Sequence, residues 1–360
     1  MAYLFITAGL DDALTVIDVT NPAAPTFYSG IRGAGAVPWL GGANGIVVQG
    51  GLAYICASNE PALTIINIRN PAVPVFVGSI QGGGAPPWLA GARSLKVANN
   101  LAYIAAQNDQ SFTIIDVTNP AAPFFVGNLQ GAGGPNFLSQ IKDVDIVGNL
   151  AYVVSRLDNS LTIINITNPA LPTLVGSIQG AGAAPWLGNA NDLQIVGNLA
   201  YIAAPADDAL TIIDVSNPAA PFYVGGIRGP GAPNFLDGAM SLQIVGNLAF
   251  VAAAQDNALT IINITNPALP VFVSTIQRNP AAGLWLLTAY SVHVENNLAY
   301  VTALNDDALV IIDVINPAVP VFVGFISGSG GPNWLDSPGF QSPFSAVLPT
   351  VTTLPATGVT

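Results

Sequence analysis

The sequence repeats one motif seven times along its whole length. The string "FTIIDVTNPAAPFFVG" starts at Phe112, and the nearly identical "LTIIDVSNPAAPFYVG" starts at Leu210. The spacing between successive Asn-Pro pairs is 49 residues five times and 50 once, from Asn21, Asn70, Asn119, Asn168, Asn217, Asn266 and Asn316. A fixed period of this size indicates a repeat architecture, in which each unit is one supersecondary structure that stacks on its neighbours.

A single repeat predicts four short strands. The β-branched runs "LQIVGN" (242–247), "LAFVAA" (248–253), "LTIINIT" (259–265) and "VFVSTI" (271–276) are each bounded by turn residues. The pairs Gly246-Asn247 and Asp256-Asn257 predict two-residue hairpin turns, and Asn266-Pro267 predicts a wider turn. Four antiparallel strands and a long Gly/Pro-rich connection, repeated seven times, predict an all-β, seven-bladed β-propeller.

The repeat also resembles a known family. The strings "LTIIDVTNPAAP" and "IVGNLAYIAA" are similar to those of the LVIVD-repeat family, and the resemblance covers roughly residues 2–327. It implies a propeller fold and a place among proteins found largely at bacterial and archaeal surfaces. It implies almost nothing about a ligand. This chain departs from the usual family repeat in its longer connection, such as "QGAGGPNFL" from Gln130.

The repeats extend without a compositional break, so we expect one propeller domain over residues 1–350 and a tail over 351–360. The chain opens on "AYLFITA" (2–8), which corresponds to the second strand of later repeats. The innermost strand of the first blade must therefore come from elsewhere. We predict that "FSAVLPTV" (344–351) supplies it, so that the C-terminal segment pairs with the N-terminal blade and closes the ring.

Composition excludes several classes of protein. The net charge is −12 with only 8 basic residues, so we do not expect nucleic acid as a partner. Hydrophobic residues make up 51% of the chain, but none of its apolar runs approaches the roughly 20 residues of a membrane-spanning helix. We therefore predict a large apolar core without membrane insertion. The single cysteine, Cys56, excludes an internal disulfide and a cysteine-cluster metal site.

One strand position alternates between two residue types. It is Asp in one repeat and Asn in the next, at Asp18, Asn67, Asp116, Asn165, Asp214, Asn263 and Asp313. Because Asn serves as well as Asp, a charge is not required there. We predict that the side-chain oxygen accepts hydrogen bonds from nearby backbone N–H groups.

A ring of polar residues is predicted on the innermost strands. The first strand of each blade follows the long connection and should line the central channel, where the equivalent positions are Lys96, Asp145, Gln194, Gln243 and His293. One interpretation is a small-ligand or ion site, or an enzyme; the other is a hydrated channel lining. His293 is the only histidine, and no nucleophile elbow is present. We therefore predict no catalytic residue, no metal and no cofactor.

The face opposite the Asn-Pro turns should carry two further rings. One is acidic, at the turn between the second and third strands: Asp11, Glu60, Asp109, Asp158, Asp207, Asp256 and Asp306. These acids lie on different blades, which disfavours a shared calcium ion. The other ring is aromatic, at the end of each connection: Trp39, Trp88, Phe137, Trp186, Phe235, Trp285 and Trp334. The aromatic residues either bind ligands as stacking platforms or fill the gaps between blades.

Near the end of the chain stands "LPATG" (354–358), which resembles the sorting signal that links proteins to cell walls. The usual apolar segment and basic tail do not follow it. With the family resemblance, this motif favours an extracellular or cell-wall-associated protein. We expect a non-enzymatic interaction module whose partner is a glycan, another protein or a second copy of itself through the aromatic face. The alternatives are an enzyme or small-ligand binder using the channel strands, and a structural subunit whose apolar faces stack.

Overall fold

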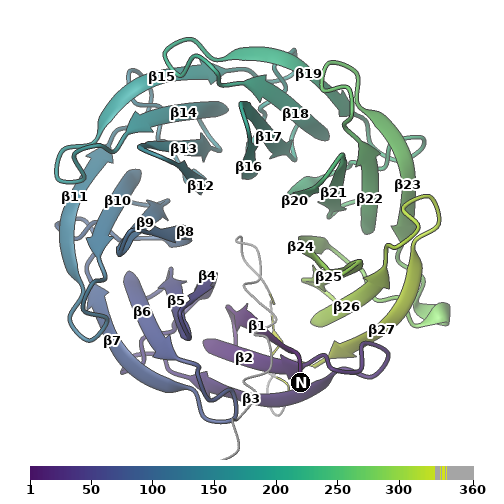
Figure 1. Cartoon of the computed structure of the whole chain (residues 1–360), viewed down its shortest axis with the longest axis horizontal. Helices are drawn as coiled ribbons and strands as arrows, with labels where there is room; N and C mark the ends of the chain where they lie inside the picture. Colours follow the sequence, from purple (N-terminus) through teal and green to yellow (C-terminus); the bar gives the residue numbers. More distant parts are fainter. Residues whose placement is uncertain (329–332, 334, 337, 339–360) are drawn as a thin grey trace, which may run out of the picture.

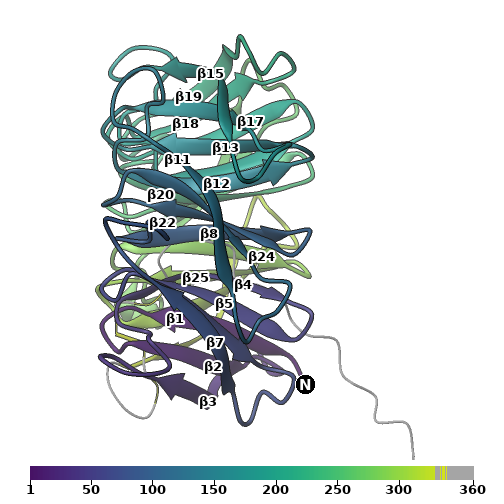
Figure 2. The same ribbon diagram turned by 90° about the vertical axis from the view of Figure 1, so that its left-hand side faces the viewer.

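A computed structural model describes residues 1–328 together with residues 333, 335, 336 and 338. Figure 1 shows seven blades in a ring around a common axis, and Figure 2 shows the ring edge-on. Six blades contain four antiparallel strands in chain order from the centre outward, and the first blade has three described strands. The predicted all-β, seven-bladed propeller is therefore confirmed.

The first four blades are built as follows. Blade one contains β1 (Tyr3–Ala8), β2 (Ala13–Asp18) and β3 (Thr26–Arg32). Blade two contains β4 (Ala43–Gln49), β5 (Leu52–Ala57), β6 (Ala62–Asn67) and β7 (Val75–Gln81). Blade three contains β8 (Ala92–Ala98), β9 (Leu101–Ala106), β10 (Ser111–Asp116) and β11 (Phe124–Gln130). Blade four contains β12 (Ile141–Val147), β13 (Leu150–Ser155), β14 (Ser160–Asn165) and β15 (Thr173–Gln179).

The last three blades follow the same order. Blade five contains β16 (Asp192–Val196), β17 (Leu199–Ala204), β18 (Ala209–Asp214) and β19 (Phe222–Arg228). Blade six contains β20 (Ala239–Val245), β21 (Leu248–Ala253), β22 (Ala258–Asn263) and β23 (Val271–Gln277). Blade seven contains β24 (Ala289–Glu295), β25 (Leu298–Ala303), β26 (Ala308–Asp313) and β27 (Val321–Ser327), and a short 3-10 helix, η1 (Pro280–Ala282), precedes it. Within the described residues, no helix has the length and apolar character needed to cross a membrane.

The hairpin turns agree with the sequence prediction at one position and differ at another. Gly246-Asn247 forms the predicted two-residue turn between β20 and β21, with Gly246 at a φ of 58°. The two-residue turn predicted at Asp256-Asn257 is wrong, because four residues separate β21 from β22. The first two, Ala254 and Gln255, donate their N–H groups to the connection before the blade, at 2.9 and 3.0 Å. Hydrogen bonds to the preceding connection thus lengthen the turn from two residues to four.

The apolar core lies between neighbouring blades. Tyr103 and Phe112 of blade three pack in one buried cluster with Leu138 and Val144 of blade four. Equivalent clusters join the other pairs of neighbours around the ring. Because a blade cannot bury both of its faces alone, stacking in the ring is the main source of its stability.

A glycine in the outermost strands allows the next blade to approach closely. A Cβ atom added to Gly127 on β11 would lie 2.5 Å from the carbonyl oxygen of Pro169, in the Asn-Pro turn of the next blade. In blade six, Ser274 stands at the equivalent position, and its hydroxyl donates to the Pro317 carbonyl oxygen. The recurring "VG" of the sequence therefore marks a contact between blades.

The first and last blades meet. Leu4 and Ile6 of blade one share a buried cluster with Tyr300 and Leu309 of blade seven. The chain beyond β27 also returns to the first blade, because Ala8 forms an isolated β-bridge with Pro338. The predicted closing strand (344–351) and the tail (351–360) lie outside the described residues.

The alternating Asp and Asn positions act as predicted. Asp116 Oδ1 accepts the N–H of Thr118, two residues later, at 2.8 Å. The N–H group two residues along the chain is the donor at all the other positions, namely Asp18, Asn67, Asn165, Asp214, Asn263 and Asp313. Hydrogen bonds from Ser216 also lower the pKa of Asp214. A side-chain carbonyl oxygen is the common requirement, which explains why both residue types occur.

Candidate functional site

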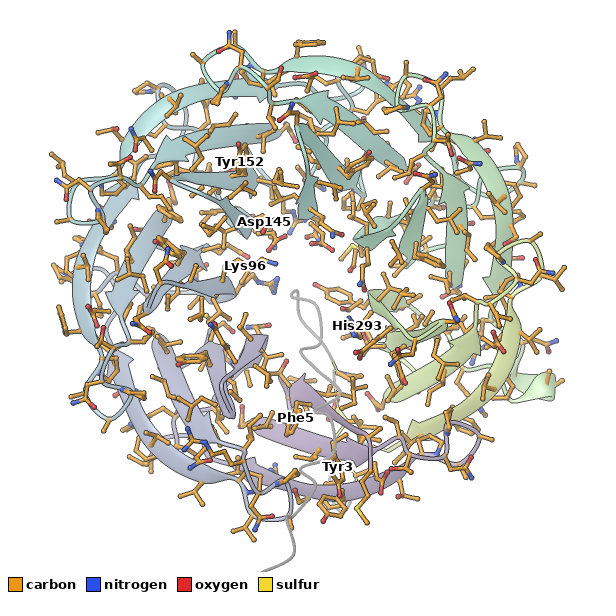
Figure 3. All side chains as sticks on the ribbon, in the orientation of Figure 1. Tyr3, Phe5, Lys96, Asp145, Tyr152 and His293 are labelled. Carbon is orange, nitrogen blue, oxygen red and sulfur yellow. The ribbon has the colours of Figure 1, made fainter. Side chains whose placement is uncertain are left out.

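The five predicted channel residues all lie on innermost strands. Lys96 is on β8, Asp145 on β12, Gln194 on β16, Gln243 on β20 and His293 on β24. Figure 3 shows Lys96, Asp145 and His293 directed toward the centre of the ring. The structure thus brings the predicted residues together around one axis, and we call them the inner ring.

Three members of the inner ring join blade four to five, five to six and six to seven. Asp145 Oδ2 accepts the N–H of Ile195 on the neighbouring innermost strand at 2.9 Å. Gln194 and Gln243 repeat this contact, accepting the N–H groups of Ile244 at 2.7 Å and Val294 at 2.6 Å. An innermost strand has an edge without a strand partner, and a buried N–H without an acceptor is costly. These side chains supply the missing acceptors.

The titratable members of the ring lie beside groups that can carry the opposite charge. Lys96 Nζ lies 3.8 Å from Asp145 Oδ1, and burial raises the pKa of Asp145 while the Lys96 ammonium opposes that rise. His293 Nε2 lies 3.7 Å from Glu295 Oε2, and its ring stacks on Tyr300. Burial lowers the pKa of His293, against an opposing influence of Glu295.

A second layer of polar side chains lies two residues before the inner ring. Asp143 Oδ2 accepts the N–H of Leu193 at 3.0 Å, and Asp192 Oδ2 accepts the N–H of Leu242 at 2.8 Å. Burial and the neighbouring Asp143 carboxyl raise the pKa of Asp192 well above its ordinary value. Strand alternation explains the second layer, because it places Asp143 on the same side of β12 as Asp145.

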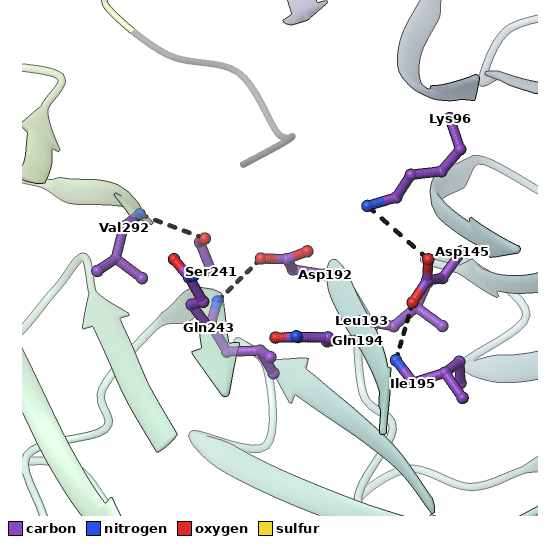
Figure 4. A pocket seen from close by; sticks show the side chains of 10 residues that line it. Lys96, Asp145, Asp192, Leu193, Gln194, Ile195, Ser241, Gln243 and Val292 are labelled. Atoms are coloured by element: carbon purple, nitrogen blue, oxygen red, sulfur yellow. Dashed lines mark hydrogen bonds and ion pairs between the residues drawn. The ribbon is translucent and has the colours of Figure 1, made fainter. Parts of the chain in front are cut away.

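The two layers line a small polar pocket, to which the innermost strands of blades three to seven all contribute. It has a volume of about 180 Å³, and the residues in Figure 4 line it, among them Lys96, Asp145, Asp192, Gln194 and Gln243. One oxygen of each acidic or amide side chain among them, Asp145, Asp192, Gln194 and Gln243, already accepts a backbone N–H group. The pocket is therefore suited to water or a small polar molecule, and its lining has a structural role.

The acidic turns hold the connections between blades. Asp109 Oδ1 accepts the N–H of Gly84 at 2.9 Å, and its Oδ2 accepts the N–H of Ala90 at 2.8 Å. The other turn acids also accept N–H groups of connection residues, namely Asp11, Glu60, Asp158, Asp207, Asp256 and Asp306. Charge-assisted bonds of this kind are strong. The described residues contain no group of three potential metal ligands.

These bonds also place the aromatic and acidic rings on one face, as predicted. We call it the loop face, and its connections are residues 33–42, 82–91, 131–140, 180–191, 229–238 and 278–288. Each of the six described aromatic side chains there is half-buried: Trp39, Trp88, Phe137, Trp186, Phe235 and Trp285. Trp334 lies outside the described residues.

A threonine fixes the backbone of most of these aromatic residues. Thr64 Oγ1 donates to the Trp39 carbonyl oxygen at 2.8 Å, and Thr113 Oγ1 donates to that of Trp88 at 2.8 Å. Thr162, Thr211 and Thr260 bind the carbonyl oxygens of Phe137, Trp186 and Phe235 in the same way. These bonds fix the backbone from which each half-buried aromatic side chain extends.

The aromatic residues differ in what covers their rings. The Arg228 guanidinium lies 5.0 Å from the ring centroid of Trp186, and that of Arg278 lies 5.9 Å from the centroid of Trp285. The cation–π contacts described for this face involve Trp186 and Trp285, so we regard the half-buried Trp39 and Trp88 as the better candidates for a ligand.

Comparison with protein families gives one match. A family model described as "LVIVD repeat" matches residues 2–31, 40–81, 91–130, 140–179, 187–227, 238–277 and 288–327. No curated protein matches the sequence.

The fold is similar to solved structures at low identity. The periplasmic gluconolactonase of Pseudomonas aeruginosa has a TM-score of 0.73 and 12% identity, over 96% of this chain and 100% of that one. A putative 6-phosphogluconolactonase from Bacteroides fragilis has a TM-score of 0.73 and 10% identity, over 94% and 96%. A protein from Lactobacillus plantarum has a TM-score of 0.72 and 12% identity, over 91% and 96%. At these identities the likeness shows the fold alone.

Proposed function

The chain belongs to the LVIVD-repeat family, and we propose that it is a non-enzymatic interaction module at a cell surface that binds glycans through its loop face. The family resemblance and the "LPATG" string at 354–358 support a place outside the cell. The location and the ligand class are both part of the proposal.

The placement of Trp39 and Trp88 on the loop face is the observation that carries this proposal. Both indoles are half-buried on neighbouring connections of the loop face, and both backbones are fixed by threonine hydroxyls. A large aromatic side chain on a fixed backbone has few torsions left to restrict, so it loses little entropy on binding. Its flat, partly apolar surface suits the apolar faces of sugar rings. Two such rings on adjacent blades form a platform for an extended glycan.

The inner ring supports a non-enzymatic role. Asp145, Gln194 and Gln243 each accept an N–H group from the next blade. A catalytic acid or base must exchange its proton with a substrate within hydrogen-bond reach. In this ring the side-chain oxygens are instead used to satisfy the edges of the innermost strands.

A glycan array with matched tryptophan variants tests the proposal. We expect Trp39→Ala and Trp88→Ala to lose most of the glycan signal, because each removes an exposed platform. Trp285→Ala is the control, since Arg278 covers that ring, and it should keep the signal while lowering the melting temperature. An array without any bound glycan, or an equal loss in the control, would contradict the proposal.

Self-association through the other face is a second candidate. The Asn-Pro turns lie on the face opposite the loop face, and we call this opposite face the turn face. Its turns expose large apolar side chains: Val73 (59% exposed), Leu171 (68%), Leu269 (68%) and Val319 (61%). Exposed apolar groups arranged around one face are typical of interaction surfaces. Sedimentation of the wild type beside a Leu171→Asp, Leu269→Asp double variant separates the two candidates. A stable oligomer that the double variant abolishes would favour stacking of copies.

A further inference from the structure

A basic pocket lies on the loop face, near the centre of the ring. Arg93, Lys142 and Arg156 line a pocket of about 260 Å³, together with Asn189, Asn191, Pro205, Met240 and Tyr290. The whole chain has only 8 basic residues and a net charge of −12. Three of those eight residues therefore gather at one place in an otherwise acidic protein.

The fold brings these cations together from separate segments. Arg93 lies at the start of β8, Lys142 at the start of β12, and Arg156 directly after β13. All three positions are at the loop-face ends of their strands, in blades three and four. Tyr290, at the start of β24 in blade seven, lines the same pocket.

The hydrogen-bond partners of two of the cations are neutral amides. Lys142 is 4% exposed, and its Nζ donates to Gln107 Oε1 at 2.9 Å. Arg156 Nε donates to Asn189 Oδ1 at 3.4 Å. Burial, with repulsion from Arg93 and Arg156, lowers the pKa of Lys142 to about 7. The positive charges around the buried Lys142 ammonium therefore repel it, and an anion bound beside Lys142 and Arg156 would relieve that repulsion.

The nearby carboxyl groups have other partners. Asp143 accepts hydrogen bonds from the Ser94 hydroxyl and the N–H of Leu193. Asp192 accepts the N–H of Leu242, and its pKa is raised well above the ordinary value. Their bonds to the backbone fix both groups in the second polar layer, so the pocket itself presents cationic and neutral donors.

We propose that this pocket binds a small organic oxyanion, a carboxylate or a phosphate ester attached to a polar molecule. The guanidinium of Arg156 and the ammonium of Lys142 would contact the oxyanion, as such groups do elsewhere. The Asn189 side chain supplies an amide for a hydroxyl group. The pocket is slightly smaller than the range of about 300–1,000 Å³ for drug-sized ligands, so the ligand is a small metabolite rather than a polymer. This site goes beyond glycan binding at Trp39 and Trp88.

Calorimetric titration with three hexose probes tests the site. Gluconate carries a carboxylate, glucose 6-phosphate carries a phosphate ester, and glucose is neutral. We expect at least one anion to bind and glucose not to bind, and the two anions distinguish the preferred oxyanion. Binding of glucose as tight as that of the anions, or no binding of either anion at millimolar concentration, would overturn the proposal.

Variants of the full chain locate the binding. Arg156→Gln changes an exposed residue, so it should fold normally and weaken anion binding about tenfold, the loss of one charge-assisted contact. Arg69→Gln makes the same change of charge at an exposed residue on the turn face, and it should bind like the wild type. An equal loss in both variants would mean attraction by overall charge and would refute the site. Glycan binding should stay unchanged in Arg156→Gln, so the two proposals fail separately.

The pH dependence tests the role of Lys142. Gluconate keeps its charge between about pH 6 and 8, while Lys142 loses its proton in that range. The neighbouring cations are Arg93 and Arg156. Burial keeps Tyr290 neutral by raising its pKa, and Asp143 and Asp192 are the neighbouring acids of the second layer. We expect gluconate affinity to fall as pH rises and to become nearly pH-independent in Lys142→Gln. An unchanged slope in that variant would remove Lys142 from the site.

Discussion

Replacing Asp109 by alanine tests whether the turn acids hold the loop face in place. The change removes two charge-assisted hydrogen bonds, from the N–H groups of Gly84 and Ala90, at 2.9 and 2.8 Å. A hydrogen bond to a charged group is worth about 1.5–3 kcal/mol. The bond to Gly84 is exposed, so screening reduces its share, and we expect a total loss of about 2–4 kcal/mol.

The loss should be visible as a shift in melting temperature. The entropy of unfolding of a chain of this size is about 0.7 kcal/mol/K, so the expected shift is about 3–6 °C. Asp109→Asn keeps one acceptor oxygen and should show about half of this shift. Asp116→Ala is the control on the turn face of the same blade. It loses one exposed bond, from Thr118, and should shift the melting temperature less.

The same variant should affect binding. Asp109 holds both ends of the connection that carries Trp88, so Asp109→Ala should also weaken glycan binding at that platform. Calorimetric unfolding and the glycan array measure the two effects on one preparation. If the melting temperature of Asp109→Ala equals that of the wild type, or is no lower than that of Asp116→Ala, the carboxylate does not hold the connection and this reasoning is refuted.

Two further predictions concern stability. The lowered pKa of Lys142, about 7 against 10.5, means that the unfolded chain binds more protons there between these values, so its contribution to stability rises with pH. Lys142→Met should therefore exceed the wild type in unfolding free energy most clearly below pH 7, and denaturant titrations that show a constant difference up to pH 10 would contradict this. The raised pKa of Asp192 has the opposite effect on the pH dependence of stability, and this effect is present in both the wild type and Lys142→Met. Gly127→Val should cost about 1–3 kcal/mol by steric conflict with Pro169, whereas Gly127→Ser should cost less, because Ser274 is accommodated at the equivalent place; equal melting temperatures would be inconsistent with the packing.

The fold could be predicted because its determinants are local and repeated. Strand alternation, turn residues and the period of the Asn-Pro pairs define a blade, and their recurrence defines the ring. The Asp and Asn positions were predictable for the same reason, since Asp116 binds an N–H group only two residues away.

The site could be predicted only in part, because its partners are distant in sequence. Asp109 binds N–H groups 25 and 19 residues before it, so turn propensity alone did not reveal its role. Asp145 and Ile195 are 50 residues apart, and only the ring places them in contact. The basic pocket combines Arg93, Lys142 and Arg156 from three strand ends, a convergence that sequence spacing does not show.

Binding measured in two fixed orientations tests the central claim, that the loop face is the binding face. Cys56 is buried, and burial raises the pKa of its thiol, so an engineered cysteine should be the reactive one. Ala36→Cys places it on the loop face and Ala122→Cys on the turn face, both at exposed positions. Each variant is coupled through its thiol to a sensor surface and exposed to a glycan panel. We predict that glycans bind the protein attached through residue 122 and not the protein attached through residue 36; equal binding in both orientations, or binding only through the turn face, would contradict the account.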